Sequence, residues 1–370
     1  MTAAVPILTR RYRRTATVTD WQSAPGNTEL EFTALGPGYG ECLVLHLGFR
    51  EWMIVDSCLT EDDEQPALQY LRRLGVDVAT EVKLVVATHW HDDHVQGMQA
   101  LVDACQSARF ACSAVLGRKE LLGAIGRRSE SERTTSSGVK EMRAVLKKVA
   151  AKHRPRAPRP MWVLECTSLH YRAEPYGCEV RALSPSSRML GLAYQRIGSL
   201  LEQSRFAQVP RDHVNDAAVA LWVEAGDATL LLGSDLEEKS CKGWTAAIAC
   251  GATRGGKAEI IKVPHHGSEG AHHPPVWAQL LHPRPHAIVC SFHCGNVDLP
   301  TDKDVERLCQ AARLHRTTPD GVRTVLRDGR LVKAFGPMGR VTLRRTFAQG
   351  NNWDVHYEGG CTGCPPPPPT

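Results

Sequence analysis

The stretch VKLVVATHWHDDH, residues 82–94, places a short apolar run directly before three histidines and two aspartates. Such a run is typical of a strand that is covered on both faces, with the polar residues leaving its carboxyl end. Two imidazoles two residues apart, those of His89 and His91, can project the same way and bind one cation. Asp93 and His94 follow on the next bend and can face a second cation. The pattern HxHxDH therefore predicts a metal site.

Two later strand ends offer the further ligands that such a site needs. The segment LLLGSD ends on Asp235 after an apolar strand, and a single carboxylate there could bridge two ions. The segment IIKVPHHGS puts His265 and His266 just after another strand. Asp56 ends the segment MIVD and is expected to orient a ligand histidine. Imidazole with carboxylate suits zinc, with manganese or iron as alternatives.

The competing interpretation of any histidine is that it is structural or exposed. That interpretation is given to five histidines away from these strand ends: His46, His153, His170, His315 and His356. It does not suit the HxHxDH cluster, because burying so many polar groups without a metal costs free energy.

The composition is that of an ordinary globular protein, with 42% hydrophobic and 23% charged residues in 370. No stretch approaches the ~18 apolar residues that a membrane span needs. The N-terminal segment has its apolar run before its arginines, the reverse of a signal peptide. The 13 cysteines are scattered through expected strands, which favours reduced, buried thiols over a disulfide framework. We therefore expect a cytoplasmic protein with no membrane association.

Positive charge is concentrated in one insert, residues 117–160, which holds 13 Lys or Arg and four Asp or Glu. The whole chain carries only +5, so the rest of it is mildly acidic. A helix is predicted over 138–153, followed by an extended proline-rich linker. This insert is either an electrostatic footprint for a phosphate-rich partner or a solvated surface helix with its linker.

Strand patterns occur in both halves of the chain, with helical patterns between them. Residues 30–36, 42–48 and 51–57 predict three strands separated by Gly and Pro turns. Residues 217–235 predict two more strands, and residues 302–315 predict a helix. Polar clusters recur at strand ends. This arrangement predicts an α/β fold in which two sheets pack together with helices outside.

Three segments are expected in the domain organisation. A loose lead-in over 1–28 precedes one main domain over 29–345, which contains the insert 117–160. The remaining residues, 346–370, are expected to form a flexible tail rich in Cys and Pro. Its CxxC, Cys361 and Cys364, is a weak indication of zinc because the chain has no second pair.

These residues resemble the metallo-β-lactamase superfamily, whose motif is HxHxDH after a strand, followed by later Asp and His ligands. The resemblance implies an αββα sandwich with the metals at one edge of the two sheets. More narrowly, the chain is similar to the soluble hydrolase domain of ComEC-type DNA-uptake proteins. That similarity covers most of residues 30–98 and 178–336, including VNDAAVALWVEAGDATLLLGSDLE and IIKVPHHGSEG. The insert, both tails and the membrane channel lie outside it.

The resemblance implies a ligand set residue by residue. His89 and His91 would hold the first metal, Asp93 and His94 the second, and Asp235 would bridge them. From the HHGS step, His265 is favoured as the closing ligand, with His266 nearly as suitable and the other facing substrate. Asn215 occupies the place of a further family histidine, and His213 stands two residues earlier. The typical N-x-x-H-P motif lacks its histidine here, since the chain reads NVDLP over 296–300.

We therefore expect a hydrolase with two divalent ions, Zn2+ or Mn2+, whose bridging hydroxide attacks a phosphodiester. Asp93 or Asp235 would take the proton, and three side chains could contact the leaving oxygen: Lys262, His266 and His213. Ser268 is expected to support the site or contact substrate. The insert arginines from Arg118 to Arg159 would attract nucleic acid without reading its sequence.

Two other interpretations remain open. The same metal site could hydrolyse a small-molecule ester, lactone or thioester, or a phosphocholine-type compound, because one fold hosts many chemistries. Alternatively the metal could be structural or vestigial, and the basic insert could recruit a protein partner. The insert distinguishes a nuclease from a small-ester hydrolase. Neutralising its positive charge should impair a nuclease and hardly affect a small-ester hydrolase.

Overall fold

Strand β4 (Val82–Ala87), which leads into the histidine cluster, lies inside a sheet and is almost wholly buried. Its Val-rich sequence suits a strand that is covered on both faces. The computed structural model describes residues 19–117, 137–150, 158–202, 214–318, 323–327, 330–334, 338–350 and 352–364. The predicted helix end at 151–153, most of the insert and His213 lie outside these ranges.

The first sheet has eight strands in the order β19-β18-β1-β2-β3-β4-β5-β6. Their bounds are β1 Glu29–Gly36, β2 Cys42–His46, β3 Trp52–Val55, β4 Val82–Ala87, β5 Arg109–Ser113, β6 Met161–Val163, β18 Gly339–Thr346 and β19 Asp354–Glu358. The pairs β3–β4, β4–β5 and β5–β6 are parallel, and the pairs from β19 through β3 are antiparallel.

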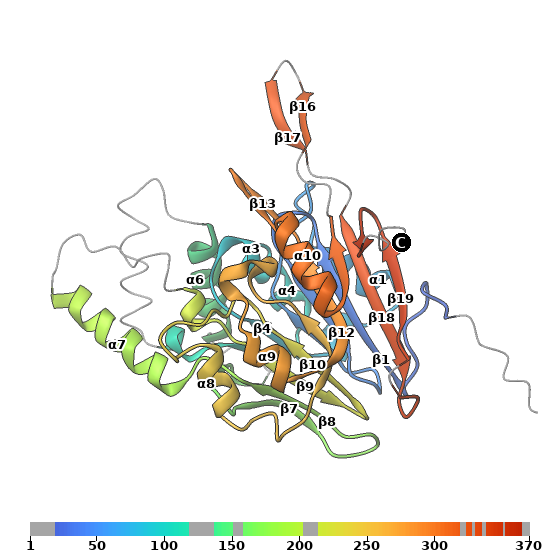
Figure 1. The fold of residues 1–370 in the computed structure, drawn as a ribbon, viewed down its shortest axis with the longest axis horizontal. Coiled ribbons are helices and arrows are strands. Elements are labelled where there is room, and N and C mark those ends of the chain that lie inside the picture. The colour runs from blue at the N-terminus through green and yellow to red at the C-terminus, as the bar shows by residue number, and fades with distance from the viewer. Residues whose placement is uncertain are drawn as a thin grey trace, which may run out of the picture.

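The second sheet also has eight strands, in the order β20-β15-β12-β11-β10-β9-β8-β7. Their bounds are β7 Ser168–Arg172, β8 Cys178–Ala182, β9 Leu221–Ala225, β10 Ala228–Leu232, β11 Ala258–Lys262, β12 Leu281–Cys290, β15 Arg313–Thr317 and β20 Thr362–Gly363. The four strands β10, β11, β12 and β15 run parallel to one another. Two hairpins stand apart from both sheets: β13 Phe292–Cys294 with β14 Val297–Leu299, and β16 Arg323–Arg327 with β17 Arg330–Ala334 (Figure 1).

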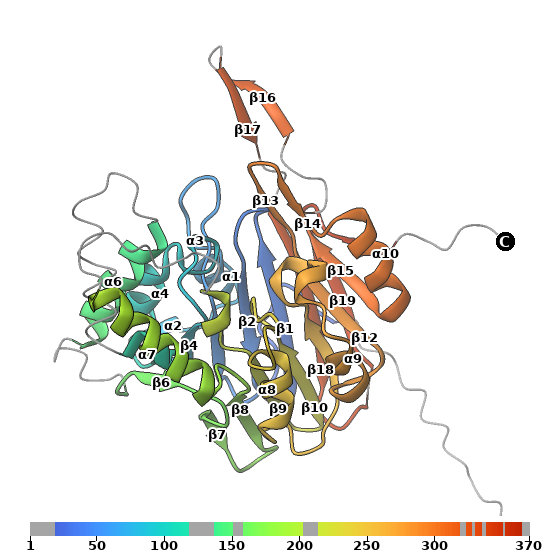
Figure 2. The same cartoon turned by 60° about the vertical axis from the view of Figure 1, so that its left-hand side comes forward.

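Helices cover the outer faces of the two sheets, so the predicted αββα sandwich is confirmed. Figure 2 shows α4 and α6 on one side of the strands and α9 and α10 on the other. The helices are α1 Pro66–Arg73, α2 Val78–Glu81, α3 Asp92–Val95, α4 Met98–Ala104, α6 Ser137–Ala150, α7 Ser187–Glu202, α8 Trp244–Ala249, α9 Pro274–Gln279 and α10 Asp302–Ala311. The described residues also form four 3-10 turns: η1 Ala114–Gly117, η3 Asn215–Ala217, η4 His265–Gly267 and η5 Glu269–Ala271.

Three apolar layers hold the sandwich together. The alternation of a strand sends Leu30, Phe32 and Ala34 of β1 into the layer between the sheets, where they join Leu221 and Val223 of β9. A second layer packs the first sheet against α1, α4 and α6, and a third packs the second sheet against α8, α9 and α10. Both sheets are therefore covered by apolar side chains on both faces. Polar side chains that follow the strands can gather only at the edge of the sandwich where the strands end.

Local sequence explains where the helices begin. Gln65 caps α1 by accepting from the Ala67 amide, with Pro66 in the first turn. Thr301 and Asp304 form a capping box at the start of α10. The predicted helix over 302–315 runs too far, because its last residues belong to β15. Pairing of β15 with the parallel strand β12 overrides their helical pattern there.

The two ends of the chain pack more closely on the sheets than the sequence indicates. Within the expected lead-in, the carbonyl of Asp20 accepts from Arg344 of β18 at 3.0 Å. Within the expected tail, β19 pairs with β18 and β20 pairs with β15. Cys364 also forms a disulfide with Cys309 of α10, while eleven other cysteines are free thiols. The expected flexible tail, as far as residue 364, therefore adds a strand to each of the two sheets. Each short strand pairs with the backbone NH and CO groups of a strand that would otherwise lie at the edge.

Candidate metal centre

The carboxyl ends of the parallel strands in both sheets meet at one edge. Asp56 follows β3 and His89 follows its parallel neighbour β4. Asp235 follows β10 and His266 follows its parallel neighbour β11. Ligand sites in open α/β sheets form at such carboxyl ends. Four side chains that are far apart in the sequence are thereby brought into one buried cluster.

Asp56 connects the strand end of β3 to the histidine loop, as the sequence predicts. Its carboxylate accepts hydrogen bonds from the amide and the hydroxyl of Thr88, both at 2.8 Å. Its Oδ2 atom also lies 2.8 Å from Nδ1 of His94. The carboxylate therefore fixes which nitrogen of His94 carries a proton and turns the other nitrogen away from Asp56.

The two other buried histidines of the cluster, His89 and His266, are oriented in the same way through Nδ1. For His89, Nδ1 lies 2.9 Å from the hydroxyl oxygen of Thr88. For His266, Nδ1 lies 2.9 Å from the carbonyl oxygen of Cys290, to which it can donate. With Nδ1 engaged outside the cluster, the Nε2 atoms of His89, His94 and His266 are left to face one another. That is the orientation histidines adopt around a metal.

Asp235 lies where these Nε2 atoms converge. Its Oδ2 atom is 3.3 Å from Nε2 of His94, 3.7 Å from that of His266 and 3.9 Å from that of His89. Nε2 of His94 and Oδ1 of Asp235 are buried without a hydrogen-bond partner among the described residues. A divalent ion between these atoms would satisfy them, and Asp235 is placed to serve two ions at once.

Two sets of potential ligand atoms share this carboxylate. Within each set the atoms lie within 4.8 Å of one another: Glu41, His94, Asp235 and His266 in one, and His89, His91 and Asp235 in the other. Asp93 is adjacent, with Oδ2 at 3.1 Å from Nε2 of His266 and 3.5 Å from that of His94. The structure therefore brings the whole HxHxDH motif together with Asp235.

The turn after β11 contributes His266 to the cluster, whereas the sequence favours His265. His265 is half-buried, and its Nδ1 lies 2.8 Å from Oε1 of Glu237. That same Glu237 atom accepts a hydrogen bond from Asn215 at 3.2 Å. A left-handed backbone at both histidines (φ 45° and 52°) turns successive side chains in different directions. His265 and Asn215 therefore belong to a polar group beside the cluster, with Glu237 between them.

Lys262 occupies a different place from the substrate-facing one expected. Its side chain is wholly buried, and its Nζ lies 2.6 Å from Oε1 of Glu41 and 3.8 Å from Oδ1 of Asp235. It also donates to the carbonyl of Ser234 at 3.2 Å. This ammonium partly neutralises two carboxylates of the cluster itself. Ser268 follows the His265–Gly267 turn, is half-buried and lines the pocket that Trp277 and Arg307 also line.

Glu41 is the cluster residue that the sequence analysis misses. It ends the turn before β2, and its amide donates to the carbonyl of Asp93 at 3.0 Å. Gly40 makes this approach feasible, because a side chain there would lie 2.8 Å from the same carbonyl and its φ is +95°. A single Glu in a Gly-rich turn has no spacing pattern that would mark it. Glu237 escapes detection for the same reason.

Burial and neighbouring charges set the protonation of the cluster. Burial holds the pKa of His89 well below its usual value, so its imidazole is neutral. Burial acts in the same direction on His94, but Asp235 and Asp93 outweigh it and raise the pKa well above its usual value. Burial would raise the pKa of Asp235, yet His94 and His266 hold it well below its usual range. A proton on His94 thus sits where a metal would bind, and metal binding would displace it.

One wall of the cluster is aromatic. The ring of Phe292, in β13, packs on the imidazole of His266 with a centroid distance of 5.0 Å. Tyr39 packs on Phe292 at 5.4 Å, and the amide of His293 donates to the carbonyl of Gly38 at 2.7 Å. The β13–β14 hairpin and the turn before β2 are therefore joined into one rim beside the cluster.

The family to which the chain belongs is established by its sequence. The family model described as Metallo-beta-lactamase superfamily matches residues 35–293, which include the buried cluster and the four strand ends that supply it. The chain therefore belongs to the metallo-beta-lactamase superfamily. No curated protein matches the chain. Among the described residues, no helix is long and apolar enough to cross a membrane.

Several solved structures are similar to this chain at low identity. The metallo-beta-lactamase fold protein YhfI from Bacillus subtilis is 11% identical, with a TM-score of 0.39 over 78% of this chain and 96% of that one. Metallo-beta-lactamase SMB-1 is 14% identical, with a TM-score of 0.36 over 70% and 87%. A mutant of the CmlA beta-hydroxylase is 14% identical, with a TM-score of 0.33 over 69% and 38%.

Proposed function

We propose that this chain is a metal-dependent phosphodiesterase that acts on nucleic acid. The observation that carries the proposal is the Asp235-centred cluster, in which three imidazoles are each turned so that Nε2 faces a shared carboxylate. Superfamily members use such a site for hydrolysis, and the basic insert supplies the preference for a phosphate-rich substrate. The similarity of the motifs to the ComEC-type hydrolase domain supports the same substrate class.

The residues fit a pair of divalent ions. His89 and His91 would hold one ion, and His94, His266 and Asp93 the other, with the carboxylate of Asp235 shared. The donor set of imidazole nitrogens and carboxylate oxygens suits Zn2+, and Mn2+ is a second candidate. The buried carboxylates of Asp93, Asp235 and Glu41 outnumber the one buried ammonium, that of Lys262. Divalent ions would balance this excess of negative charge.

Bound metal ions would lower the pKa of a coordinated water and stabilise charge that develops on the attacked phosphate. The chain's own groups position and move protons around that chemistry. Asp56 holds the imidazole of His94 in one tautomer, and Lys262 holds Glu41 and Asp235 in place. Asp93 is 7% exposed, and His94 and His266 outweigh burial and hold the pKa of its carboxylate below the usual range, so it stays charged and can accept a hydrogen bond from water at the cluster.

The described part of the insert lies beside the metal loop, which supports a nucleic-acid substrate. Helix α6 packs against α3, which carries Asp93 and His94, and against α4. The amide of Gly138, in α6, donates to the carboxylate of Asp92. The exposed face of α6 carries Lys140, Arg143 and Lys147. Phosphates drawn to this face would therefore lie next to the cluster.

A substrate panel tests the proposal. Zinc-loaded and manganese-loaded protein is incubated with single- and double-stranded DNA, RNA, bis-p-nitrophenyl phosphate and a set of lactones. We expect cleavage of a nucleic acid and of the diester. The triple variant K140Q, R143Q and K147Q should weaken nucleic-acid cleavage and flatten its salt dependence, while the diester rate stays near wild type. Hydrolysis of lactones alone would refute the phosphodiesterase assignment.

A further inference from the structure

The turn η4 (His265–Gly267), which presents His266 to the cluster, has an unfavourable backbone. Its three residues all have positive φ, 45° and 52° at the two histidines and 85° at Gly267. Non-glycine residues adopt this region only where their surroundings impose it. The turn therefore depends on contacts from neighbouring elements to keep its shape.

Contacts on the inner side of the turn come from the second sheet. The amide of His265 donates to the carbonyl of Ser234 at 2.9 Å, directly after β10. The imidazole of His266 bonds to the carbonyl of Cys290 at the end of β12. These contacts tether the two histidines to strand ends, but they leave the carbonyl of Gly267 on the outer side.

Helix α10 holds that outer side. Nη2 of Arg307 donates to the carbonyl of Gly267 at 2.8 Å. A side chain added at Gly267 would lie 3.3 Å from both Leu308 of α10 and Pro300, so the turn packs directly on this helix. Arg307 thus bonds to the residue that immediately follows His266 in the chain.

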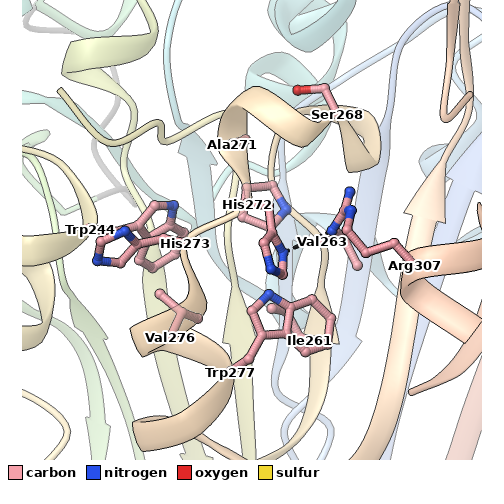
Figure 3. Close-up of a pocket in the computed structure, with 11 residues that line it drawn as sticks. Trp244, Ile261, Val263, Ser268, Ala271, His272, His273, Val276, Trp277 and Arg307 are labelled. Atoms are coloured by element: carbon pink, nitrogen blue, oxygen red, sulfur yellow. Dashed lines mark hydrogen bonds between the residues drawn. The ribbon is translucent and has the colours of Figure 1, made fainter. Parts of the chain in front are cut away.

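Arg307 is itself fixed in position. Its Nη2 also lies 2.9 Å from Oδ1 of Asp304, and its Nη1 donates to Nδ1 of His272 at 2.8 Å. Figure 3 shows the guanidinium reaching toward His272 in a pocket that Trp277 also lines. Burial and the charge of Arg307 lower the pKa of His272, which keeps this ring neutral and able to accept. The other oxygen of Asp304 caps α10 through Thr301.

We propose that Arg307 is a positioning residue that holds the η4 turn, and with it His266, in the conformation in which Nε2 of His266 faces the metal cluster. All three of its close contacts are within the protein, to Gly267, Asp304 and His272. Arg307 therefore acts through the backbone of the turn. The inference rests on the proposed metal site and is independent of the substrate.

The test compares the full-length variants R307A and R307K with K303A. Lys303 is exposed on the same helix, four residues before Arg307, so its removal controls for loss of a cation from α10. For each protein we would measure zinc affinity by competition with a chelating dye and the absorption spectrum after cobalt substitution. The melting temperature of the metal-free protein separates positioning from folding.

We expect R307A to bind zinc about tenfold more weakly or worse, as when a group that orients a metal ligand is removed. The cobalt spectrum should change, because the geometry at His266 relaxes. R307K should not restore the zinc affinity, since one ammonium cannot reproduce the hydrogen bonds that the planar guanidinium makes through Nη1 and Nη2. K303A should match wild type.

If R307A does not fold, R307K decides the matter by the same two readings. Wild-type zinc affinity and an unchanged cobalt spectrum in a folded R307A or R307K would overturn the inference, even with a lower melting temperature. Failure of the wild type to bind zinc is a separate outcome that refutes the metal site itself.

Discussion

Two groups of buried histidines in this molecule differ in how their ring nitrogens are satisfied. His46, in β2, bonds through Nδ1 to the carbonyl of Glu29 at 2.8 Å and accepts from the amide of Arg50 at Nε2 at 3.2 Å. His94 is equally buried and has a partner for Nδ1, but its Nε2 has no hydrogen-bond partner among the described residues. Both ring nitrogens of His46 have partners within the protein, and we call such a ring complete. The ring of His94 is incomplete, because its Nε2 would find a partner only in a bound metal ion.

His286 and His315 extend the comparison. They stack in the second sheet, with Nδ1 of His286 at 2.9 Å from Nε2 of His315. Nδ1 of His315 lies 2.5 Å from the hydroxyl of Tyr357. These rings satisfy each other and need no ion. Burial of a histidine therefore does not mark a candidate metal site, whereas several Nε2 atoms that converge on one buried carboxylate do.

The largest effect is expected when the shared carboxylate is removed. In D235N, the amide can no longer offer an anionic oxygen to the Nε2 atoms on both sides. We expect zinc affinity to fall at least about a hundredfold, and hydrolysis to fall about 10³-fold or more, the scale for one member of a catalytic unit. Elemental analysis after dialysis and a rate assay would measure both. D62N, at an exposed loop position, should bind zinc normally; zinc retained by D235N would remove Asp235 from the centre.

The next effect concerns the ion pair that joins the two halves of the site. Glu41 precedes β2 of the first sheet, and Lys262 ends β11 of the second. E41Q leaves a wholly buried ammonium with less compensation, so we expect a loss of about 3–5 kcal/mol in the free energy of unfolding. Urea denaturation of metal-free protein measures it. The double variant E41Q with K262M should lose less than the two single variants together, and strict additivity would mean that the pair is not coupled.

A smaller effect is expected at Asp56, which orients one of the incomplete rings. In D56N, the side-chain amide cannot accept from Nδ1 of His94 and from Thr88 as the carboxylate does. We expect zinc affinity to fall about 10- to 100-fold while the fold is kept. The matched variant is H46Q, which alters a complete ring. It should reduce stability and leave zinc affinity unchanged; equal zinc affinities for D56N and H46Q would erase the distinction between the two groups.

The sequence predicts the histidines of the cluster better than it predicts the residues that orient them. His89, His91 and His94 lie within one six-residue stretch just after a clear strand, so their convergence could be foreseen. Asp56 and Asp235 also end apolar strands, and parallel strands bring such ends together. The choice between His265 and His266 depends on a left-handed backbone, which the residue types do not reveal.

Other features depend on tertiary contacts that no local pattern encodes. Glu41 is one acidic residue in a turn, and Arg307 acts from helix α10, which begins 36 residues after His266. The last strands, β19 and β20, lie in a segment whose Cys and Pro content predicts a flexible tail. They form because exposed edges of both sheets offer backbone partners.

The smallest effect is a pH dependence of the complete rings. Burial lowers the pKa of His46 to about 3 from 6.5. Its folded-state pKa is depressed, so its contribution to stability is full above pH 6.5 and is lost as the pH falls from there toward 3. Between pH 7 and 5.5, wild type should therefore lose about 1 kcal/mol more than H46Q, whose amide does not titrate.

Urea denaturation at the two pH values measures this difference. K303Q serves as control, because it removes an exposed cation but no imidazole, and it should follow wild type. The same experiment with H315Q is expected to show a similar reduction, since burial, His286 and Arg313 hold the pKa of His315 at about 3. An acid sensitivity that persists in both histidine variants would assign the effect to other groups. It would then show that protonation of His46 and His315 does not cause the loss of stability at lower pH.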